Sequence, residues 1–183
     1  MQSQSEPGKP RRGMVLWFTG LSASGKTTLS QAVAKALRAR GEAATVLDGD
    51  AMRQTLSRDL GFSRADRETN MRRLAALAQE HAAQDEIVLV AIISPFRELR
   101  EQLRRESQAS FLEIFVDAPL ATCEERDPKG LYQRARSGEL ARFTGVSDPY
   151  EPPTAPDVHC FTAEERVDAS AARILKAIEN AAR

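Results

Sequence analysis

Two adjoining stretches decide the fold: Met14-Val-Leu-Trp-Phe-Thr19 and, directly after it, Gly20-Leu-Ser-Ala-Ser-Gly-Lys-Thr27. The first stretch is short and apolar, which is typical of a strand covered on both faces. The second fits the pattern G-x-x-x-x-G-K-[ST], whose glycines let backbone N–H groups approach a phosphate without a Cβ in the way. Residues 28–40 then predict a helix, whose apolar face carries Leu29, Val33, Ala36 and Leu37. A strand, this loop and a helix N-terminus in that order predict a site that binds phosphate.

The rest of the chain alternates between strand and helix patterns. Further strands are predicted at residues 43–47, 87–93 and 112–116, with a weaker one at 158–161. One helix is predicted to start at a capping box, Ser63–Asp66, and to end at about residue 84. A second is predicted to have Ser94 as N-cap and Pro95 in its first turn, and to end at residue 105. A last helix is predicted to follow a cap at residues 162–165. The last helix has an expected core face of Val167, Ala171, Ile174, Leu175 and Ile178. This alternation predicts an α/β fold of the three-layer P-loop NTPase type, with a parallel five-stranded sheet between helices.

The composition limits the classes of protein to which the chain can belong. Its 183 residues suit one domain at 14–183, and the balance of 26 Lys plus Arg against 26 Asp plus Glu does not favour a nucleic-acid partner. The two cysteines, Cys123 and Cys160, are too few for a disulfide framework, and we expect buried thiols. Residues 1–13 predict a flexible polar tail that lacks the apolar core of a signal peptide. The longest apolar run, residues 87–93, is too short to cross a bilayer, so we expect a cytoplasmic protein without a membrane partner.

One segment interrupts the alternation, at about residues 127–156. It lies between two predicted strands and is too long for a plain connection. It carries the prolines 128, 149, 152, 153 and 156 and the cations Lys129, Arg134, Arg136 and Arg142. A mobile lid over the site is one interpretation, and a passive surface excursion is the other. We favour the lid, because long segments of this kind are commonly functional.

Two residues of the phosphate loop carry defined chemistry. Lys26 is expected to face the ligand and bridge the β- and γ-phosphates of a nucleotide, and Thr27 to offer its hydroxyl to Mg²⁺. Guanine-specific P-loop proteins usually carry the pattern N-K-x-D, which neither Asn70 nor Asn180 begins. ATP is therefore the predicted nucleotide.

Carboxylates at the ends of two predicted strands compete for the acceptor side of the site. Asp48 and Asp50 follow the second strand, and Asp117 ends the fourth, where a Walker B aspartate would stand. The ends of such strands face the ligand crevice, so a carboxylate there can orient an acceptor hydroxyl or hold the metal. A structural interpretation also exists for each: turn or N-cap residues for the pair, and the N-cap before Pro119 for Asp117. We favour the pair.

Beyond these features, the chain resembles the adenylylsulfate kinases from Trp17 to about Thr162. The matching segments are Phe18–Thr28, Leu47–Asp50 with Arg53, Asp59–Ser63, Asp66-Arg67 with Asn70, Ile93–Arg97, Phe115–Asp117, Cys123–Tyr132, Phe143–Gly145 and Pro149–Glu151. Together they are far more selective than the phosphate loop alone. The chain departs from the family pattern at Ala23-Ser24, where Gly-Ala is common, and at Ile92, where Phe is common.

The resemblance implies a role for each matched position. Lys26, Asp50 and Ser94 are the implied catalytic residues: Asp50 stands next to the acceptor hydroxyl and, with Thr27, next to Mg²⁺, and Ser94 matches a described phosphoserine intermediate. The implied ATP-binding residues are Gly20, Leu21, Ser22, Ala23, Ser24, Gly25, Lys26, Thr27, Thr28, Arg126, Cys160 and Thr162. The implied acceptor-binding residues are Asp48, Asp50, Arg53, Phe62, Arg67, Asn70, Ile93, Ser94, Lys129 and Phe143.

Some of these positions have a second interpretation. Phe62 and Phe143 would hold the adenine of the acceptor, or else pack in the core. Arg67 would hold the phosphosulfate together with Asn70 on the same helix face, or else be a solvated charge. For Ser94 the alternative is the helix N-cap.

The reaction implied by the resemblance is transfer of the γ-phosphate of ATP to the 3′-hydroxyl of adenosine 5′-phosphosulfate, the second step of sulfate activation. Two other functions remain open: another small-molecule P-loop kinase, acting on a sugar acid or a nucleoside, and a non-enzymatic nucleotide-binding module. The aspartate pair and the charged lid disfavour the module. The resemblance also implies a homodimer, with an ATP sulfurylase as a candidate partner.

Overall fold

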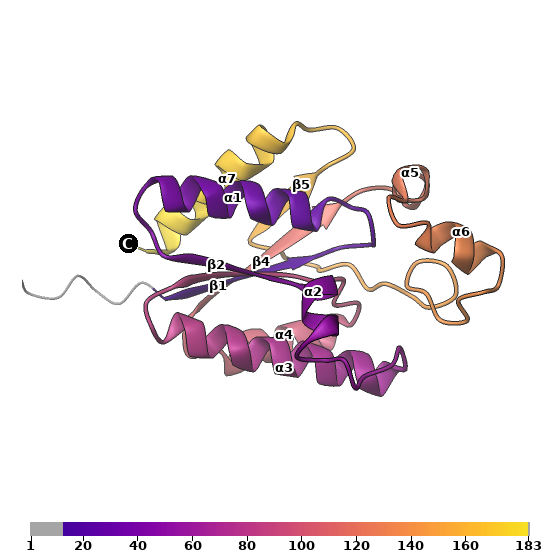
Figure 1. The fold of residues 1–183 in the computed structure, drawn as a ribbon. Helices are drawn as coiled ribbons and strands as arrows, with labels where there is room; N and C mark the ends of the chain where they lie inside the picture. The colour runs from indigo at the N-terminus through magenta and orange to yellow at the C-terminus, as the bar shows by residue number, and fades with distance from the viewer. Residues whose placement is uncertain (1–12, 183) are drawn as a thin grey trace, which may run out of the picture.

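The computed structural model of the protein describes residues 13–182, so residues 1–12 of the predicted tail lie outside the described part. The strands are β1 (Met14–Thr19), β2 (Ala44–Asp48), β3 (Ile87–Ala91), β4 (Ser110–Asp117) and β5 (Val158–Phe161). The helices are α1 (Lys26–Ala39), α2 (Gly49–Gln54), α3 (Arg64–Ala82), α4 (Arg97–Glu106), α5 (Leu120–Arg126), α6 (Leu131–Arg136) and α7 (Val167–Ala181). The strands pair in parallel in the order β2-β3-β1-β4-β5, which confirms the predicted fold class (Figure 1).

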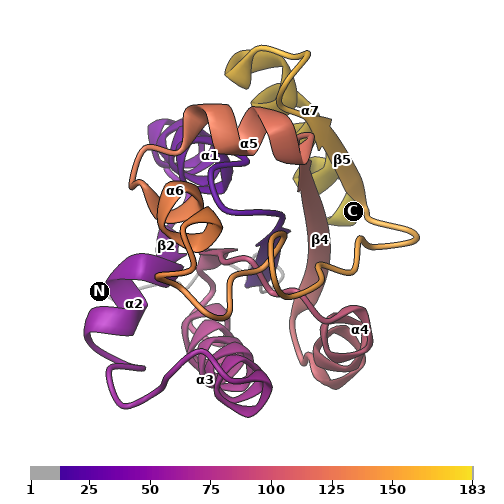
Figure 2. The same cartoon turned by 90° about the vertical axis from the view of Figure 1, so that its right-hand side faces the viewer.

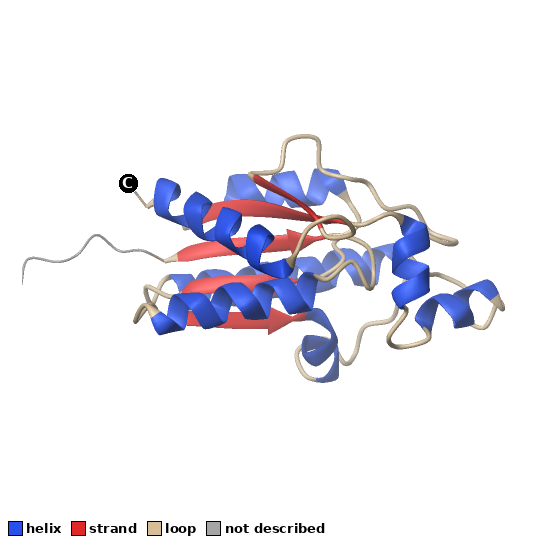
Figure 3. Cartoon of the chain, turned by 90° about the horizontal axis from the view of Figure 1, so that it is seen from above, coloured by secondary structure: helices blue, strands red, loops and turns tan. Residues whose placement is uncertain are grey.

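Strand β1 divides its side chains between two cores, one on each face of the sheet. Leu16 and Phe18 belong to the core that includes α1 and α7, whereas Val15 and Trp17 belong to the core that includes α3 and α4. Figures 1 and 3 show these helices stacked over the two faces of the sheet. Because both faces are covered, β1 and β3 are buried at every position.

Helix α4 begins at Arg97, so the prediction that Ser94 and Pro95 form its N-cap and first turn is wrong. Ser94 has a left-handed backbone, with φ of 41°, and its buried Oγ accepts a hydrogen bond from Trp17 Nε1 at 3.1 Å. The N–H of Arg97 is bonded instead by a carboxylate oxygen of Glu151, at 2.8 Å. This partner lies 54 positions away, so the local sequence carries no signal for it.

Helix α7 begins at Val167, five residues later than the cap predicted at Thr162. The Thr162 hydroxyl is used elsewhere, because it donates to the carbonyl of Ser24 at 2.6 Å. Val167 is 42% exposed and does not belong to the core face, although the other four residues predicted for that face are buried. The capping box predicted at Ser63 and Asp66 is present at the start of α3.

Segment 127–156 contains α6 and is anchored at both ends. At its start, the Asp127 carboxylate accepts from the N–H of Leu131 at 2.8 Å, which fixes the turn into α6. At its end, the Tyr150 hydroxyl lies 2.9 Å from the Thr19 hydroxyl, at the end of β1, and Glu151 holds the start of α4. Between these anchors, a small apolar cluster of Cys123, Tyr132, Ala135 and Phe143 packs the segment onto α5.

A buried cation connects α4 with the segments around it. Arg100 is 1% exposed, and its guanidinium donates to Glu113 of β4 at 2.7 Å and to the carbonyls of Ser94 and Glu151, both at 2.6 Å. A charge this deep in the protein needs such partners to offset the loss of water. Arg100 therefore ties the end of β3, the end of segment 127–156 and β4 to one another.

Both cysteines are free and buried, as predicted. Burial raises the pKa of the Cys160 thiol to about 11, which keeps it protonated and unreactive at neutral pH. Within residues 13–182, no helix is long and apolar enough to cross a membrane.

Candidate nucleotide and acceptor site

A cavity of about 1040 Å³ lies at the carboxyl ends of the parallel strands. The phosphate loop, the ends of β2 and β3, the start of α3 and parts of segment 126–144 form its walls. Figure 2 looks onto this end of the sheet, where α2, α5 and α6 surround the strand ends. A pocket for one small ligand usually has about 300–1,000 Å³, so this cavity has room for two ligands side by side.

The carbonyl groups of the phosphate loop are bonded by side chains, one after another. Lys26 donates to the carbonyls of Gly20 at 3.0 Å and Leu21 at 2.6 Å. Tyr132 donates to that of Ser22 at 3.0 Å. Arg126 donates to that of Ala23 at 3.5 Å, and Thr162 to that of Ser24 at 2.6 Å. A loop that turns its N–H groups toward an anion leaves its carbonyls in need of partners, and these side chains supply them.

Two positions of the loop have an unusual backbone environment: Gly20 has no room for a Cβ, and Ala23 has a positive φ. A Cβ at Gly20 would lie 2.3 Å from the carbonyl oxygen of Val116, so the close approach of the loop to β4 excludes any larger residue. Ala23 has φ of 58°, a left-handed conformation that costs a residue with a Cβ about 1–2 kcal/mol. The glycine that is common here in the resembling family would avoid this cost.

Lys26 lines the cavity, as expected for a residue that faces the ligand, but its side chain is only 9% exposed. Its ammonium group is folded back onto the carbonyls of the loop. Burial lowers the pKa of Lys26 to about 8, because the charged form loses its water. An anionic ligand beside it would favour the charged form and raise this pKa again.

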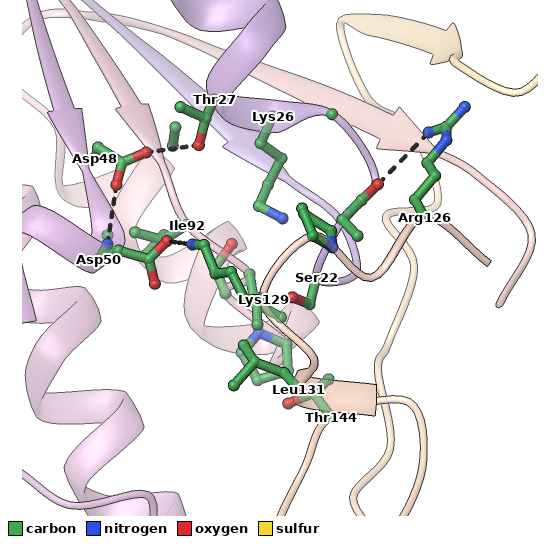
Figure 4. A pocket seen from close by; sticks show the side chains of 18 of the residues that line it. Ser22, Lys26, Thr27, Asp48, Asp50, Ile92, Arg126, Lys129, Leu131 and Thr144 are labelled. Carbon is green, nitrogen blue, oxygen red and sulfur yellow. Dashed lines mark hydrogen bonds and ion pairs between the residues drawn. The ribbon is translucent and has the colours of Figure 1, made fainter. Parts of the chain in front are cut away.

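Thr27, Asp48 and Asp50 form a row beside Lys26 (Figure 4). The Thr27 hydroxyl donates to Asp48 Oδ2 at 2.6 Å, and the other Asp48 oxygen accepts from the N–H of Asp50 at 3.0 Å. The Asp50 carboxylate is 62% exposed and pairs with the ammonium group of Lys129, which reaches it from segment 127–156. Lys129 thus closes one side of the cavity in this structure.

The side-chain oxygens of Thr27, Asp48 and Asp50 are of the types that bind Mg²⁺. Hydroxyl and carboxylate oxygens are the ligands that this ion prefers, and it commonly takes one or two from the protein and the rest from phosphates and water. Residues 13–182 contain no cluster of three or more acidic, His or Cys side chains that would hold a metal without such a ligand.

Asp117, the competing carboxylate, is placed differently. Its Oδ2 lies 2.9 Å from Nε2 of His159 on β5, and its side chain does not line the cavity. It is not a helix N-cap either, because α5 begins at Leu120 with no side-chain cap. The geometry therefore favours the pair Asp48 and Asp50 for the acceptor side.

One end of the cavity is aromatic and cationic. Phe62 lines it and is 56% exposed, so core packing does not account for this ring. The Arg53 guanidinium lies 4.4 Å from the centroid of the Phe62 ring. Phe143 lies on the same wall, 8% exposed, and packs edge-on against Tyr132 at 5.0 Å between centroids. A flat apolar group placed here would cover Phe62.

Arg67 and Asn70 line the same end from α3, as their spacing predicted, but Arg67 is neither solvated nor free. Its guanidinium donates to the carbonyls of Phe62 and Arg142 and to the hydroxyl of Thr144, each at 3.0 Å. Burial lowers the pKa of Arg67, although not enough to neutralise an arginine. The residue therefore ties α3 to segment 142–144.

Asn70, unlike Arg67, has a buried polar atom without a hydrogen-bond partner in the described residues. The residue is 7% exposed, and the atom is its Oδ1. A buried polar group left unpaired is costly. A ligand in the cavity is the natural partner for this amide.

The other end of the cavity lies between α5 and the start of α7. Thr162, Glu165, Val167 and Ser170 line it, together with Arg126, whose guanidinium donates to the Thr162 carbonyl at 2.7 Å. Cys160, implied as an ATP contact, is fully buried and does not line the cavity. The Cys160 side chain lies in the core beside α7, whereas Thr162, which directly follows the end of β5, reaches the phosphate loop.

Most of the remaining predicted residues do line the cavity, namely Ser22, Ala23, Gly25, Thr28 and Ile93. Gly20, Leu21 and Ser24 of the loop do not line it. Ser94 lines it, but its Oγ bonds Trp17, and no His or carboxylate in residues 13–182 bonds that oxygen to activate it.

Several further residues line the cavity without having been predicted as binding residues, and three of the polar ones are Arg142, Thr144 and Glu165. Thr144 lies inside the Phe143–Gly145 match and could have been found there. Arg142 and Glu165 stand in polar stretches where local pattern does not distinguish a wall of a cavity from a solvated surface.

Comparisons with known proteins identify the relatives of this chain. The sequence model described as adenylylsulphate kinase matches residues 12–161. The adenylyl-sulfate kinase of Synechococcus sp. (strain JA-3-3Ab) is 54% identical over 157 residues, which cover 86% of this chain and 89% of that protein.

Solved structures agree. The Mycobacterium tuberculosis APS kinase, in complex with AMPPNP and APS, superposes with a TM-score of 0.89 at 43% identity, covering 93% of this chain and 99% of the other. A gluconokinase from Sinorhizobium meliloti superposes with a TM-score of 0.60 at 19% identity, covering 94% and 95%, and shares the fold alone. The fold is thus common to small-molecule kinases, and the sequence match separates them. The chain belongs to the adenylylsulphate kinase family.

Proposed function

We propose that this cavity transfers the γ-phosphate of ATP to the 3′-hydroxyl of adenosine 5′-phosphosulfate (APS), giving ADP and 3′-phosphoadenosine 5′-phosphosulfate. The observation that carries the proposal is the two-ended cavity. Phe62 at one end and Val167 at the other are both exposed apolar side chains that a purine would cover. Lys26 and Asp50, which suit a phosphate and an acceptor hydroxyl, lie between the two ends.

In this assignment, ATP lies along the phosphate loop with its base near Val167, and APS lies with its base near Phe62. Lys26 exchanges the loop carbonyls for the β- and γ-phosphates and stabilises the charge that develops on the leaving oxygen. Asp50 accepts a hydrogen bond from the 3′-hydroxyl and takes its proton while the new O–P bond forms and the bond to the β-phosphate oxygen breaks. Mg²⁺, held by Thr27 and the Asp48–Asp50 pair, would neutralise phosphate charge.

Residues 127–156 act as the lid in this proposal. Lys129, Arg134 and Arg142 line the cavity from this segment, while its two ends stay anchored at Asp127 and at Tyr150. Lys129 pairs with Asp50 here, so the arrival of substrate replaces one partner of Asp50 by another. Closure over both substrates would exclude water and prevent hydrolysis of ATP.

Ser94 acts in this proposal through position rather than as a nucleophile. Its left-handed backbone is held by the bond from Trp17 to its Oγ and by the bond from Arg100 to its carbonyl. Direct in-line transfer between the two substrates needs no phosphoserine.

The first prediction concerns the acceptor carboxylate. Asp50→Asn should lower kcat by about 10²-fold or more, because the amide keeps the shape but cannot take the proton. Asp117→Asn is the matched control, since its side chain bonds His159 outside the cavity, and it should keep kcat near that of the unchanged enzyme. Steady-state release of ADP with APS as acceptor measures both. A mild effect at Asp50 with a severe one at Asp117 would reverse the assignment.

The second prediction concerns Arg67, whose bonds now make it a tie between α3 and the lid. Arg67→Ala should lower kcat/KM for APS by about 10- to 150-fold, while ATP affinity changes little. The variant should also lose at least about 2 °C in Tm, because three acceptors, one buried and two partly buried, lose their donor. Arg72→Ala, an exposed change on the same helix, is the control. Equal losses for both substrates would place Arg67 outside the acceptor end.

The third prediction concerns Lys26 and pH. Because burial holds its pKa near 8 in the free protein and phosphates favour the charged form, ATP binding should take up about half a proton at pH 8 and about a tenth at pH 7. Calorimetry of ATP binding in buffers of different ionisation enthalpy measures this uptake. Lys26→Arg, which stays charged, should abolish it. Uptake that is absent at pH 8, or that persists in the arginine variant, would assign the proton to another group.

We further propose that the chain works as a homodimer, as the family resemblance implies, and in the cytoplasm, as its short apolar runs suggest. Sedimentation velocity at micromolar concentration should then show a species of twice the 20.2 kDa chain mass. A single monomeric species would contradict the proposal. The same run with ATP sulfurylase added tests whether that enzyme docks.

A further inference from the structure

Glu165 lines the donor end of the cavity and has no part in the reaction as derived so far. We propose that Glu165 selects adenine over guanine in the phosphate donor, with one carboxylate oxygen accepting a hydrogen bond from the 6-amino group of the purine. The inference rests on the proposed function, because it takes ATP as the donor and places its base at this end.

The position of Glu165 follows from the direction in which the loop holds a nucleotide. The γ-phosphate must point toward Asp50, so the base must leave the loop on the opposite side. On that side, a Cβ at Gly25 would lie 3.8 Å from a side-chain carbon of Thr162, which brings segment 162–167 against the start of α1. Glu165 and Val167 belong to this segment and line the cavity. The base of ATP therefore arrives beside them.

Two neighbours suit a purine ring at this place. Val167 is 42% exposed, although it is apolar, and a ring would cover it. The Arg126 guanidinium is held by bonds to the carbonyls of Ala23 and Thr162, so it presents a fixed planar cation on which an aromatic ring can stack. With the ring between these two surfaces, its polar edge is left for another lining residue to recognise, and Glu165 is such a residue.

The orientation of Glu165 is fixed by two donors on α7. Its Oε2 accepts from the Ser170 hydroxyl at 2.8 Å and from the Arg173 guanidinium at 2.5 Å. Neither of these bonds uses Oε1. A carboxylate held at one oxygen presents the other in a constant direction, which is what recognition of a single amino group requires.

The charge state of Glu165 sets its preference. The Arg173 guanidinium, followed by the Ser170 hydroxyl, holds the pKa of the Glu165 carboxyl below its usual range, so it is ionised at neutral pH. An ionised carboxylate only accepts hydrogen bonds. It therefore attracts the 6-amino group of adenine and repels the 6-oxo group of guanine. Without the guanine-specific N-K-x-D pattern, the chain needs such a contact to discriminate between the two donors.

The test compares kcat/KM for three donors at saturating APS: ATP, GTP and purine riboside triphosphate, which has no group at position 6. Glu165→Ala should lower kcat/KM for ATP by about 10- to 150-fold and leave purine riboside triphosphate unchanged relative to the unaltered chain. Glu165→Gln, whose amide can donate to the 6-oxo group, should lower the ratio of ATP to GTP by at least about tenfold. Glu164→Gln, at the exposed neighbouring position, should leave every ratio as it was.

A purely structural role for Glu165, as an anchor for α7, gives a different result. Loss of the bonds to Ser170 and Arg173 would then weaken all three donors equally, and an unchanged ratio of ATP to GTP overturns the inference. The unaltered chain gives a second test that depends on no variant: it should use purine riboside triphosphate at least about tenfold less well than ATP, and equal use overturns the inference. Failure of the proposed function looks different again, because the unaltered chain would then phosphorylate APS with none of the donors.

Discussion

The bonding of five successive carbonyls in the phosphate loop is the constraint on which the rest of the site depends. A loop that presents its N–H groups to an anion must turn its carbonyls the other way, and each needs a donor. Here the donors come from the loop's own lysine, from α6, from α5 and from the segment after β5. The loop is thus held by parts of the chain that lie more than a hundred residues away.

The same bonds connect the phosphate loop to the segment that we propose as the lid. Tyr132 belongs to the proposed lid, and Arg126 directly precedes it, so a shift of this segment would change the hydrogen bonds to the carbonyls of Ser22 and Ala23. Lys26 bonds two of the carbonyls, and in the proposed reaction it exchanges them for phosphate oxygens. Phosphate binding and the position of the lid are therefore mechanically linked through hydrogen bonds of ordinary strength, each worth about 0.5–1.5 kcal/mol.

Much of this fold could be predicted from the sequence, because β1, β3 and β4 are covered on both faces and their apolar runs are unmistakable. Two of the wrong predictions concern positions where the hydrogen-bond partner is distant in the sequence, whereas a local partner was predicted. Ser94 looks like an N-cap, but Glu151 bonds the start of α4 in its place. Thr162 looks like a cap, but its hydroxyl donates a hydrogen bond to the carbonyl of Ser24 in the phosphate loop. The pattern of apolar residues put Val167 in the core, whereas it lies at the mouth of the cavity. In the candidate site, the loop and the aspartates were predictable from motif and position, but the bonds of Arg67 and the place of Glu165 required the folded chain.

The order of the strands has a consequence for how the protein is made. Strand β1 is synthesised first, yet its neighbours in the sheet are β3 and β4, which begin at residues 87 and 110. Until β3 and β4 emerge from the ribosome, both edges of the apolar strand β1 stay unpaired. Such edges pair readily with other chains. The four side chains that donate to the phosphate loop, those of Lys26, Arg126, Tyr132 and Thr162, are all present only when residue 162 has been added. Nucleotide can therefore help to stabilise this fold only after nearly the whole chain has been translated.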